Sequence, residues 1–286
     1  MNTWKLIALD VDGTLLMNDK SLHPDTVRDI SEASQKGAQF VYCSGRSVPE
    51  IRLIAEQLPM IRYAVCLSGA LVYDLEEDAI LYRRAIPQEL VYRIMEAADG
   101  EGDPMLHFLM DRETIVRGDQ VTHMADFCRA DFQETFNLTT RSVSDMQEEA
   151  RRHDSVPKFN LYCRNAEQRS RICKKLEGLP LTVIQIEEAS LEINAEGVSK
   201  AAGMLALTEH LGIRMDEVMA VGDSENDRAV LQAVGFPVAM ANAEEAIKEL
   251  CGTVTENDND HNGVGEALHR FIRWEMPSAS SAQSAK

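Results

Sequence analysis

Apolar runs alternate with amphipathic stretches in the first and last thirds of the chain. The run from Lys5 to Val11 ends in charged residues and glycine, which predicts a strand buried on both faces of a parallel sheet. Pro24 and Gly37 bracket periodic apolar positions and so predict a helix. Further strands are expected at 39–42, 64–67, 191–194, 218–221 and 236–239, and further helices at 49–58, 200–211 and 226–233. This alternation is typical of an α/β fold built on a doubly wound parallel sheet.

The middle of the chain has a different order of elements. Helices are expected at 87–98 and 166–176, and strands at 105–110, 114–117, 158–163 and 181–186. This order predicts an α+β domain inserted into the sheet domain. We expect a core formed by residues 1–84 and 191–274 and an inserted domain formed by residues 85–190. A last helix is predicted at 264–274, and the Ser/Ala-rich residues 275–286 carry too little apolar surface to fold.

The charge of the chain narrows its range of partners. It has 29 Lys and Arg against 47 Asp and Glu, a formal net charge of -18. Binding to nucleic acid or to an anionic membrane through a basic surface is therefore disfavoured, and an anionic substrate must be captured locally. No apolar run approaches the roughly 20 residues of a membrane span. Together with six scattered cysteines that form no CxxC pair, this predicts a cytoplasmic protein.

Two acidic motifs follow predicted strands. DVDGT contains Asp10 and Asp12, two apart, and GDSEND contains Asp223 and Asp227. Carboxyl ends of parallel strands open on one edge of a sheet, so we expect these four carboxylates to gather there. Hard oxygen ligands in that number suit Mg²⁺, and two neighbouring carboxylates also suit a nucleophile and a general acid. Each motif alone is equally typical of a solvated turn or a helix cap.

Two weaker signals point to the same edge. CSGRS follows the second predicted strand, where the Ser44 hydroxyl and nearby backbone N–H groups such as that of Gly45 suit a phosphate. Asn226 in GDSEND is an amide that hydrogen-bonds a phosphate oxygen without repelling it. Lys200 begins a helix, where an ammonium suits a phosphoryl group or an attacking carboxylate. An ordinary strand-to-helix turn and a surface lysine are the alternative interpretations.

Together these parts match the demands of phosphoryl transfer. In this order, DVDGT, CSGR, Lys200 and GDSEND resemble the four motifs of the haloacid dehalogenase superfamily of phosphohydrolases. The inserted segment resembles a class II cap, and LSGALVYD, LEINAEGVSK and VTENDNDHNGVGEAL look like the Cof-type branch. The resemblance spans the whole chain except the tail.

The resemblance implies roles for the acidic residues. Asp10 matches the nucleophile that forms an aspartyl-phosphate. Asp12 matches the general acid that protonates the leaving oxygen and later activates water. Mg²⁺ would be held by Asp10, the Asp12 carbonyl and Asp223, and Asp227 would support the metal site.

The resemblance also implies how substrate is held. Ser44, with the adjacent Gly45, and Asn226 would contact the phosphate, Lys200 would balance charge, and Arg46 would reach the substrate or the cap. Three positions depart from the usual pattern: Ser44 replaces Thr, Ser68 replaces Asn, and Ala201 replaces Gly. Ser44 keeps the hydroxyl, whereas Ser68 shortens a polar group near the cap hinge.

The sequence thus predicts a Mg²⁺-dependent phosphatase of small phosphomonoesters, with sugar phosphates or phosphorylated cofactors as the substrate class that the family implies. A phosphomutase or phosphotransferase of a related capped branch is one alternative. A second is a non-enzymatic module in which Asp10 is a phospho-acceptor for signalling. The partner that we expect is a small phosphorylated metabolite, and the oligomeric state is left open.

Overall fold

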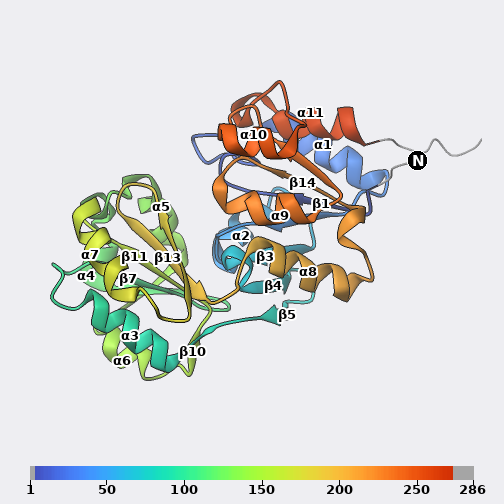
Figure 1. The fold of residues 1–286 in the computed structure, drawn as a ribbon. Helices are drawn as coiled ribbons and strands as arrows, with labels where there is room; N and C mark the ends of the chain where they lie inside the picture. The colour runs from blue at the N-terminus through green and yellow to red at the C-terminus, as the bar shows by residue number, and fades with distance from the viewer. Residues whose placement is uncertain (1–3, 273–286) are drawn as a thin grey trace, which may run out of the picture.

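The computed structural model describes residues 4–272 and consists of two lobes (Figure 1). The first lobe contains the N-terminal third and the C-terminal third of the chain, and the second contains the middle third. The predicted end of the last helix, at 273–274, and the tail predicted at 275–286 lie outside the described residues. Among residues 4–272, no helix has the length and apolarity needed to cross a membrane.

The core lobe contains a seven-stranded sheet in the order β15-β14-β1-β2-β3-β4-β5. Its strands are β1 (Leu6–Leu9), β2 (Phe40–Cys43), β3 (Tyr63–Cys66), β4 (Leu71–Asp74), β5 (Ala79–Arg83), β14 (Val218–Gly222) and β15 (Phe236–Ala239). The five strands from β15 through β14, β1 and β2 to β3 are parallel, each paired with its neighbour in the sheet, as the apolar runs predict. The antiparallel hairpin of β4 and β5 extends the sheet at one edge. From β1 the chain continues through β2 and β3 toward one edge of the sheet, and from β14 it continues to β15 toward the other edge. The ends of β1 and β14 therefore form a topological switch point.

Helices lie on both sides of this sheet (Figure 1). They are α1 (Pro24–Gln35), α2 (Val48–Ala55), α8 (Lys200–Leu211), α9 (Arg228–Ala233), α10 (Glu245–Cys251) and α11 (Gly263–Phe271). Short 3₁₀ helices are η1 (Leu67–Gly69), η4 (Met215–Glu217), η5 (Glu225–Asp227) and η6 (Asn259–His261). α1 begins with Pro24 as its first residue, which confirms the predicted start.

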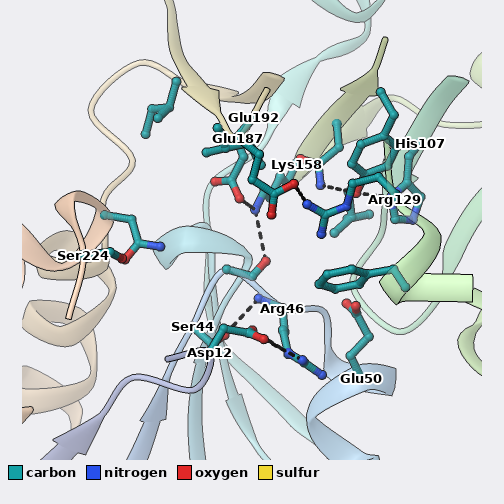
Figure 2. A pocket seen from close by; sticks show the side chains of 18 of the residues that line it. Asp12, Ser44, Arg46, Glu50, His107, Arg129, Lys158, Glu187, Glu192 and Ser224 are labelled. Atoms are coloured by element: carbon teal, nitrogen blue, oxygen red, sulfur yellow. Dashed lines mark hydrogen bonds and ion pairs between the residues drawn. The ribbon is translucent and has the colours of Figure 1, made fainter. Parts of the chain in front are cut away.

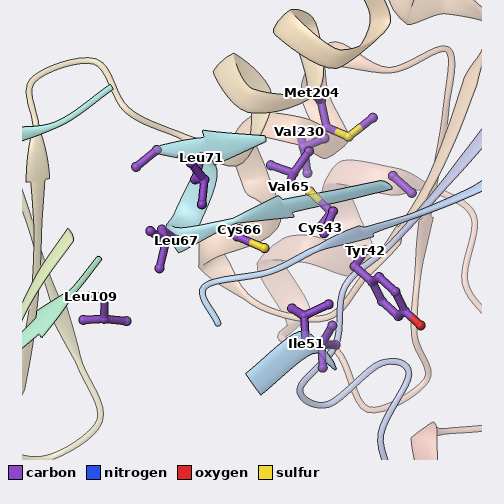
Figure 3. Close-up of a cluster of buried hydrophobic side chains, with 14 of the residues drawn as sticks. Tyr42, Cys43, Ile51, Val65, Cys66, Leu67, Leu71, Leu109, Met204 and Val230 are labelled. Atoms are coloured by element: carbon purple, nitrogen blue, oxygen red, sulfur yellow. The ribbon is translucent and has the colours of Figure 1, made fainter. Parts of the chain in front are cut away.

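The central strands are buried on both faces. Tyr42, Cys43, Val65 and Cys66 of β2 and β3 pack among side chains from neighbouring helices, including Met204 of α8 (Figure 3). Burial of such side chains is worth about 1.5–3 kcal/mol each. The loops that follow these strands are therefore anchored to a rigid layer.

The inserted lobe contains a six-stranded sheet in the order β12-β13-β11-β7-β8-β9. Its strands are β7 (Met105–Leu109), β8 (Thr114–Arg117), β9 (Thr140–Val143), β11 (Lys158–Tyr162), β12 (Leu181–Ile186) and β13 (Ser190–Ala195). Its helices are α3 (Gln88–Ala98), α4 (Gly118–Val121), α5 (Gln133–Thr139), α6 (Met146–Ala150), α7 (Ala166–Leu176), η2 (Met124–Phe127) and η3 (Ala130–Phe132). A short pair, β6 (Ile86–Pro87) and β10 (Ser155–Val156), lies beside the main sheet. All pairs in the main sheet are antiparallel except β8 with β9.

The predicted return to the core at residue 191 is wrong. β13 pairs with β11 and β12 of the inserted sheet, so the run 191–194 is not a core strand. An apolar strand pattern does not reveal which sheet a strand joins, because pairing depends on partners distant in sequence. From this pairing we infer that the inserted domain comprises residues 85–195 and the core the described residues on either side.

Candidate active site

Three strand ends meet at one edge of the core sheet. Asp10 directly follows β1, Ser44 follows β2, and Asp223 follows β14. β1 lies between β14 and β2, and the backbone N–H of Asp10 donates to the carbonyl of Val221 on β14 (3.0 Å). The parallel pairing thus brings the predicted motifs together, although DVDGT and GDSEND are more than 200 residues apart in the chain.

Lys200 is the centre of a buried charge cluster. Its Nζ donates to Asp10 Oδ1 (2.5 Å), Asp227 Oδ1 (2.7 Å) and Asn226 Oδ1 (3.0 Å). The Lys200 side chain is 1% exposed. Lys200 is the first residue of α8. The start of this helix is fixed by Ser199, whose Oγ accepts a hydrogen bond from the N–H of Ala202. Lys200 is therefore a buried lysine in contact with Asp10 and not a surface lysine.

A second group of hydrogen bonds orients Asp223 and Asp227, which are candidate metal ligands. Thr14 Oγ1 donates to Asp223 Oδ1 (2.8 Å), and Asp227 Oδ2 accepts from the N–H of Asp223 (3.0 Å). Gly13 has φ +78°, and a Cβ at this position would lie 2.5 Å from Asp223 Oδ2. The glycine of DVDGT therefore permits both the turn and the close approach of Asp223.

Two carboxylates share the single ammonium of Lys200, and this sets their proton affinities. Burial, and then the negative charge of Asp227, raises the pKa of Asp10 well above its usual range. Burial, followed by the charge of Asp227, also raises the pKa of Asp223, to about 6. Burial alone would lower the pKa of Lys200, but the charges of Asp10 and Asp227 raise it well above its usual value. The cluster has an excess of negative charge, which a cation would compensate.

The cluster has the donor set of a magnesium site. Asp10, Asp223 and Asp227 each offer a carboxylate oxygen, and these three atoms lie within 4.8 Å of one another. Asp227 already uses both its oxygens, on Lys200 and on the backbone N–H groups of Asp223 and Ser224. The chemistry fits Mg²⁺, with Asp10 and Asp223 as the better direct ligands and Asp227 as a residue that holds the others in place.

Asp12 lies apart from this cluster in an ion pair. Arg46 donates to both carboxylate oxygens of Asp12, through Nε and Nη2 (2.8 Å each), and Lys20 Nζ donates to Oδ1 (3.1 Å). Burial would raise the pKa of Asp12, but the hydrogen bonds and charge of Arg46, with a contribution from Lys20, hold that pKa well below its usual range. Asp12 is therefore ionised in this arrangement.

The site residues open into a cavity of about 680 Å³ between the two lobes. Asp10, Asp12, Ser44, Gly45, Arg46 and Asn226 line it on the core side. Lys200, Asp223 and Asp227 lie close to Asp10 but are not among the residues that line the cavity. From the inserted domain, His107, Arg129 and Lys158 face Asp12 and Arg46 across the cavity (Figure 2). This volume holds a small organic ligand.

The sequence also matches a known protein family. Residues 7–268 match the model of a family described as haloacid dehalogenase-like hydrolase. The chain belongs to this family. The resemblance predicted from the four motifs is thereby confirmed, and so is the assignment to a phosphatase-type hydrolase.

Relatives of this haloacid dehalogenase-like hydrolase have the same extent. The 5-amino-6-(5-phospho-D-ribitylamino)uracil phosphatase YcsE of Bacillus subtilis is 26% identical, over 94% of this chain and 96% of that protein. The putative phosphatase YxeH of the same organism is 28% identical, over 94% and 98%. A haloacid dehalogenase-like hydrolase from Bacteroides thetaiotaomicron has a similar structure, with a TM-score of 0.82 and 25% identity over 94% of this chain and 99% of that chain.

The motif residues of this hydrolase are supported by residues that the motifs do not include. Asn242 Nδ2 donates to the carbonyl of Gly13 (2.7 Å), and its Oδ1 accepts from the N–H of Asn259 (3.2 Å). Asn259 Nδ2 donates to the carbonyl of Leu16 (3.0 Å). These amides hold the loop after β1 from segments more than 220 residues away. Asn259 lies within the segment VTENDNDHNGVGEAL, whereas no local sequence signal reveals Asn242.

Lys158 of the inserted domain contacts the core near Ser44 and Gly45, where the phosphate is expected. Lys158 Nζ contacts Glu192 Oε1 (2.7 Å) and donates to the carbonyl of Gly45 (3.0 Å) and to Ser68 Oγ (3.1 Å). Ser68 in turn donates to Glu192 Oε2 (2.9 Å). The short side chain of Ser68 is thus part of the contact between the lobes. One sequence signal for Lys158 exists: KFNLY alternates polar and apolar residues, which is typical of a strand with two different faces.

Proposed function

We propose that this haloacid dehalogenase-like hydrolase is a Mg²⁺-dependent phosphatase that hydrolyses small phosphomonoesters through a phosphorylated Asp10. The observation that carries the proposal is the Lys200 cluster. One ammonium joins the Asp10 carboxylate to Asp227, beside Asp223, at the inner end of a cavity that is large enough for a metabolite. Nucleophile, counter-charge and metal ligands are the parts that phosphoryl transfer requires.

In the first half-reaction, a carboxylate oxygen of Asp10 attacks phosphorus while the bond from phosphorus to the leaving oxygen breaks. Lys200 holds Asp10 in position through Oδ1, which leaves Oδ2 for the attack. Ser44, the backbone of Gly45 and Asn226 line the cavity where the phosphoryl oxygens would lie. Bound Mg²⁺ would neutralise charge on those oxygens, and Asp10 and Asp223 would hold it, with the Asp12 carbonyl as a further ligand.

Asp12 has two protonation tasks in the proposed reaction. It donates a proton to the leaving oxygen in the first half-reaction and accepts a proton from the attacking water in the second. Its ion pair with Arg46 keeps it in the ionised form that the second task needs. The first task requires that Asp12 leave Arg46 and take up a proton, which loss of the guanidinium contact favours because it raises the pKa of the carboxyl, before Asp12 donates that proton to the leaving oxygen. Water then cleaves the acyl phosphate, releases phosphate and restores the Asp10 carboxylate.

A small phosphorylated metabolite is the proposed substrate. Two relatives from Bacillus subtilis, YcsE and YitU, are named as phosphatases of 5-amino-6-(5-phospho-D-ribitylamino)uracil, a phosphorylated polyol joined to a heterocycle. These names support sugar phosphates or phosphorylated cofactors as the substrate class. A cytoplasmic location stays a prediction from the sequence.

Phosphate release tests the proposal directly. We expect Mg²⁺-dependent release from a panel of sugar phosphates, phosphorylated cofactors and p-nitrophenyl phosphate. Asp10→Asn should abolish release because the amide is a poor nucleophile. Asp216→Asn is the matched control, since this aspartate is exposed and its side chain pairs with Arg214 of the same turn, so turnover should stay at the wild-type level.

The alternatives predict different products. A phosphomutase would convert substrate to an isomer without free phosphate, and a signalling module would form a long-lived phosphorylated Asp10 with negligible turnover. Absence of phosphate release from every panel member by the metal-loaded enzyme would contradict the proposed hydrolysis.

A further inference from the structure

One face of the inserted sheet forms the side of the cavity opposite Asp10, and we call its cavity-lining residues on β7, β11 and β13 the roof. Lys158, Asn160 and Tyr162 alternate along β11 and so share a face. In the register, Asn160 pairs with His107 on β7 and with Glu192 on β13. All five residues line the cavity. The roof is thus a row of polar side chains facing the proposed phosphate site.

The hydroxyl of Tyr162 orients two members of the roof. Asn160 Nδ2 donates to Tyr162 Oη (3.0 Å), and Oη lies 3.3 Å from His107 Nδ1. Oη accepts from the amide, and in the tautomer in which Oη donates to Nδ1 the neutral imidazole carries its own proton on Nε2. Burial, with a smaller effect of the charge of Lys158, lowers the pKa of His107 to about 3, which keeps the ring neutral.

The other ends of these two side chains have no partner. Within residues 4–272, no hydrogen bond reaches His107 Nε2 or Asn160 Oδ1. The two residues are only 2% and 6% exposed. An unpaired buried polar group costs about 1–3 kcal/mol, and both side chains line the cavity, so a ligand that reached these two atoms would recover that cost. With the imidazole proton on Nε2, the pair offers one donor and one acceptor, which fits a hydroxyl or the N–H/C=O edge of a lactam.

The cations of the cavity wall are already paired. Arg129 pairs with Glu187 and lies 3.9 Å above the ring of Phe132, and Lys158 pairs with Glu192 at 2.7 Å. A second anionic group on a ligand would have to displace one of these carboxylates and lie beside it. Such like-charge contact in a buried site is unfavourable. The wall therefore disfavours substrates with a second negative group near the roof.

We propose that His107 and Asn160 are specificity-determining residues that bind an uncharged donor–acceptor group of the leaving part of the substrate, and that Glu187 excludes a second anion by occupying Arg129. The inference rests on the proposed phosphatase function for the orientation of the substrate. It assigns to these residues a preference for phosphomonoesters whose distal part is a polyol or a lactam heterocycle.

Binding tests this preference without turnover. Calorimetry on the Asp10→Asn variant with Mg²⁺ would compare glucose 6-phosphate, which carries hydroxyls, uridine 5′-monophosphate, which carries a lactam edge, and 6-phosphogluconate, which carries a carboxylate. We expect at least one uncharged ligand to bind about tenfold or more tightly than 6-phosphogluconate, since one lost polar contact is worth about a factor of ten. The tighter of the two identifies hydroxyl or lactam as the bound group.

Two substitutions in the Asp10→Asn variant test the roles of Asn160 and Glu187. Asn160→Leu conserves volume and should weaken the tighter uncharged ligand about tenfold, with a smaller effect on 6-phosphogluconate. Glu187→Gln should tighten 6-phosphogluconate about tenfold because it frees Arg129. Asn194→Leu is the matched control: Asn194 is a buried asparagine on the same sheet face with an unpartnered Oδ1, and it does not line the cavity. Asn194→Leu should leave the affinity for both ligands unchanged.

Tighter or equal binding of 6-phosphogluconate would overturn the inference. So would an equal loss for all ligands in Asn160→Leu, or the same loss in Asn194→Leu, because either pattern indicates a structural role. Circular dichroism and melting curves would establish that each variant is folded. Hydrolysis of p-nitrophenyl phosphate by the wild type reports separately on the proposed function, so selective binding without any turnover would support the roof assignment and overturn the phosphatase.

Discussion

The two sides of the cavity use buried polar groups differently. On the core side, Lys200 satisfies Asp10, Asp227 and Asn226 at once, and the remaining charge is of a kind that a cation compensates. On the roof, the charges cancel in pairs, and the unsatisfied atoms are the neutral ends of His107 and Asn160. The side proposed for phosphoryl transfer thus keeps an excess of negative charge, whereas the side proposed for substrate recognition keeps unpaired hydrogen-bonding atoms.

The largest effect is expected on the core side. Lys200→Met removes the shared ammonium and leaves Asp10 and Asp227 as adjacent buried carboxylates, one of which must take up a proton. We expect kcat for p-nitrophenyl phosphate to fall about 10²- to 10³-fold, in the range found for loss of a single electrostatic group. Lys248→Met, at the surface on α10, is the control. A fall of less than threefold would show that Lys200 is not part of the chemistry.

A smaller effect on turnover and a larger one on folding are expected at the contact between the lobes. Lys158→Met leaves Glu192 buried without its partner, which should cost about 3–5 kcal/mol in the free energy of unfolding. The double variant Lys158→Met/Glu192→Leu removes both charges and should recover most of that loss. Urea denaturation measures both. If the double variant were as unstable as the single one, the loss would come from packing and not from an unpaired charge.

The smallest effect concerns the pH dependence of stability. His107 has a folded-state pKa of about 3, far below the usual value near 6.5. Between these values the unfolded chain takes up a proton that the folded one does not, so the stability contribution is complete above about pH 6.5 and is lost as the pH falls toward 3. His107→Phe removes this contribution. Its melting temperature should therefore decline less than that of the wild type between pH 7 and pH 4.5, and an identical decline would contradict a neutral buried His107.

The core and its motifs could be predicted because their signals are local. A strand buried on both faces is a continuous apolar run, and the residues after it lie at the edge where parallel sheets place ligands. The positions of Asp10, Ser44 and Asp223 follow from that rule, whereas their proposed roles rest on the family resemblance. The β4–β5 hairpin is not predicted by the pattern, since its short strands join an edge of the sheet in the opposite direction.

The sequence by itself determined the family, the α/β core, the existence of an insertion and the residues gathered at the strand ends. Only the tertiary structure decided that 190–195 belongs to the inserted sheet, that Asp12 pairs with Arg46, and that Asn160 meets His107 across the roof. The reason is physical. Hydrophobic period and turn chemistry act between near neighbours in the chain, whereas strand pairing, ion-pair choice and the lining of a cavity depend on which distant segments pack together.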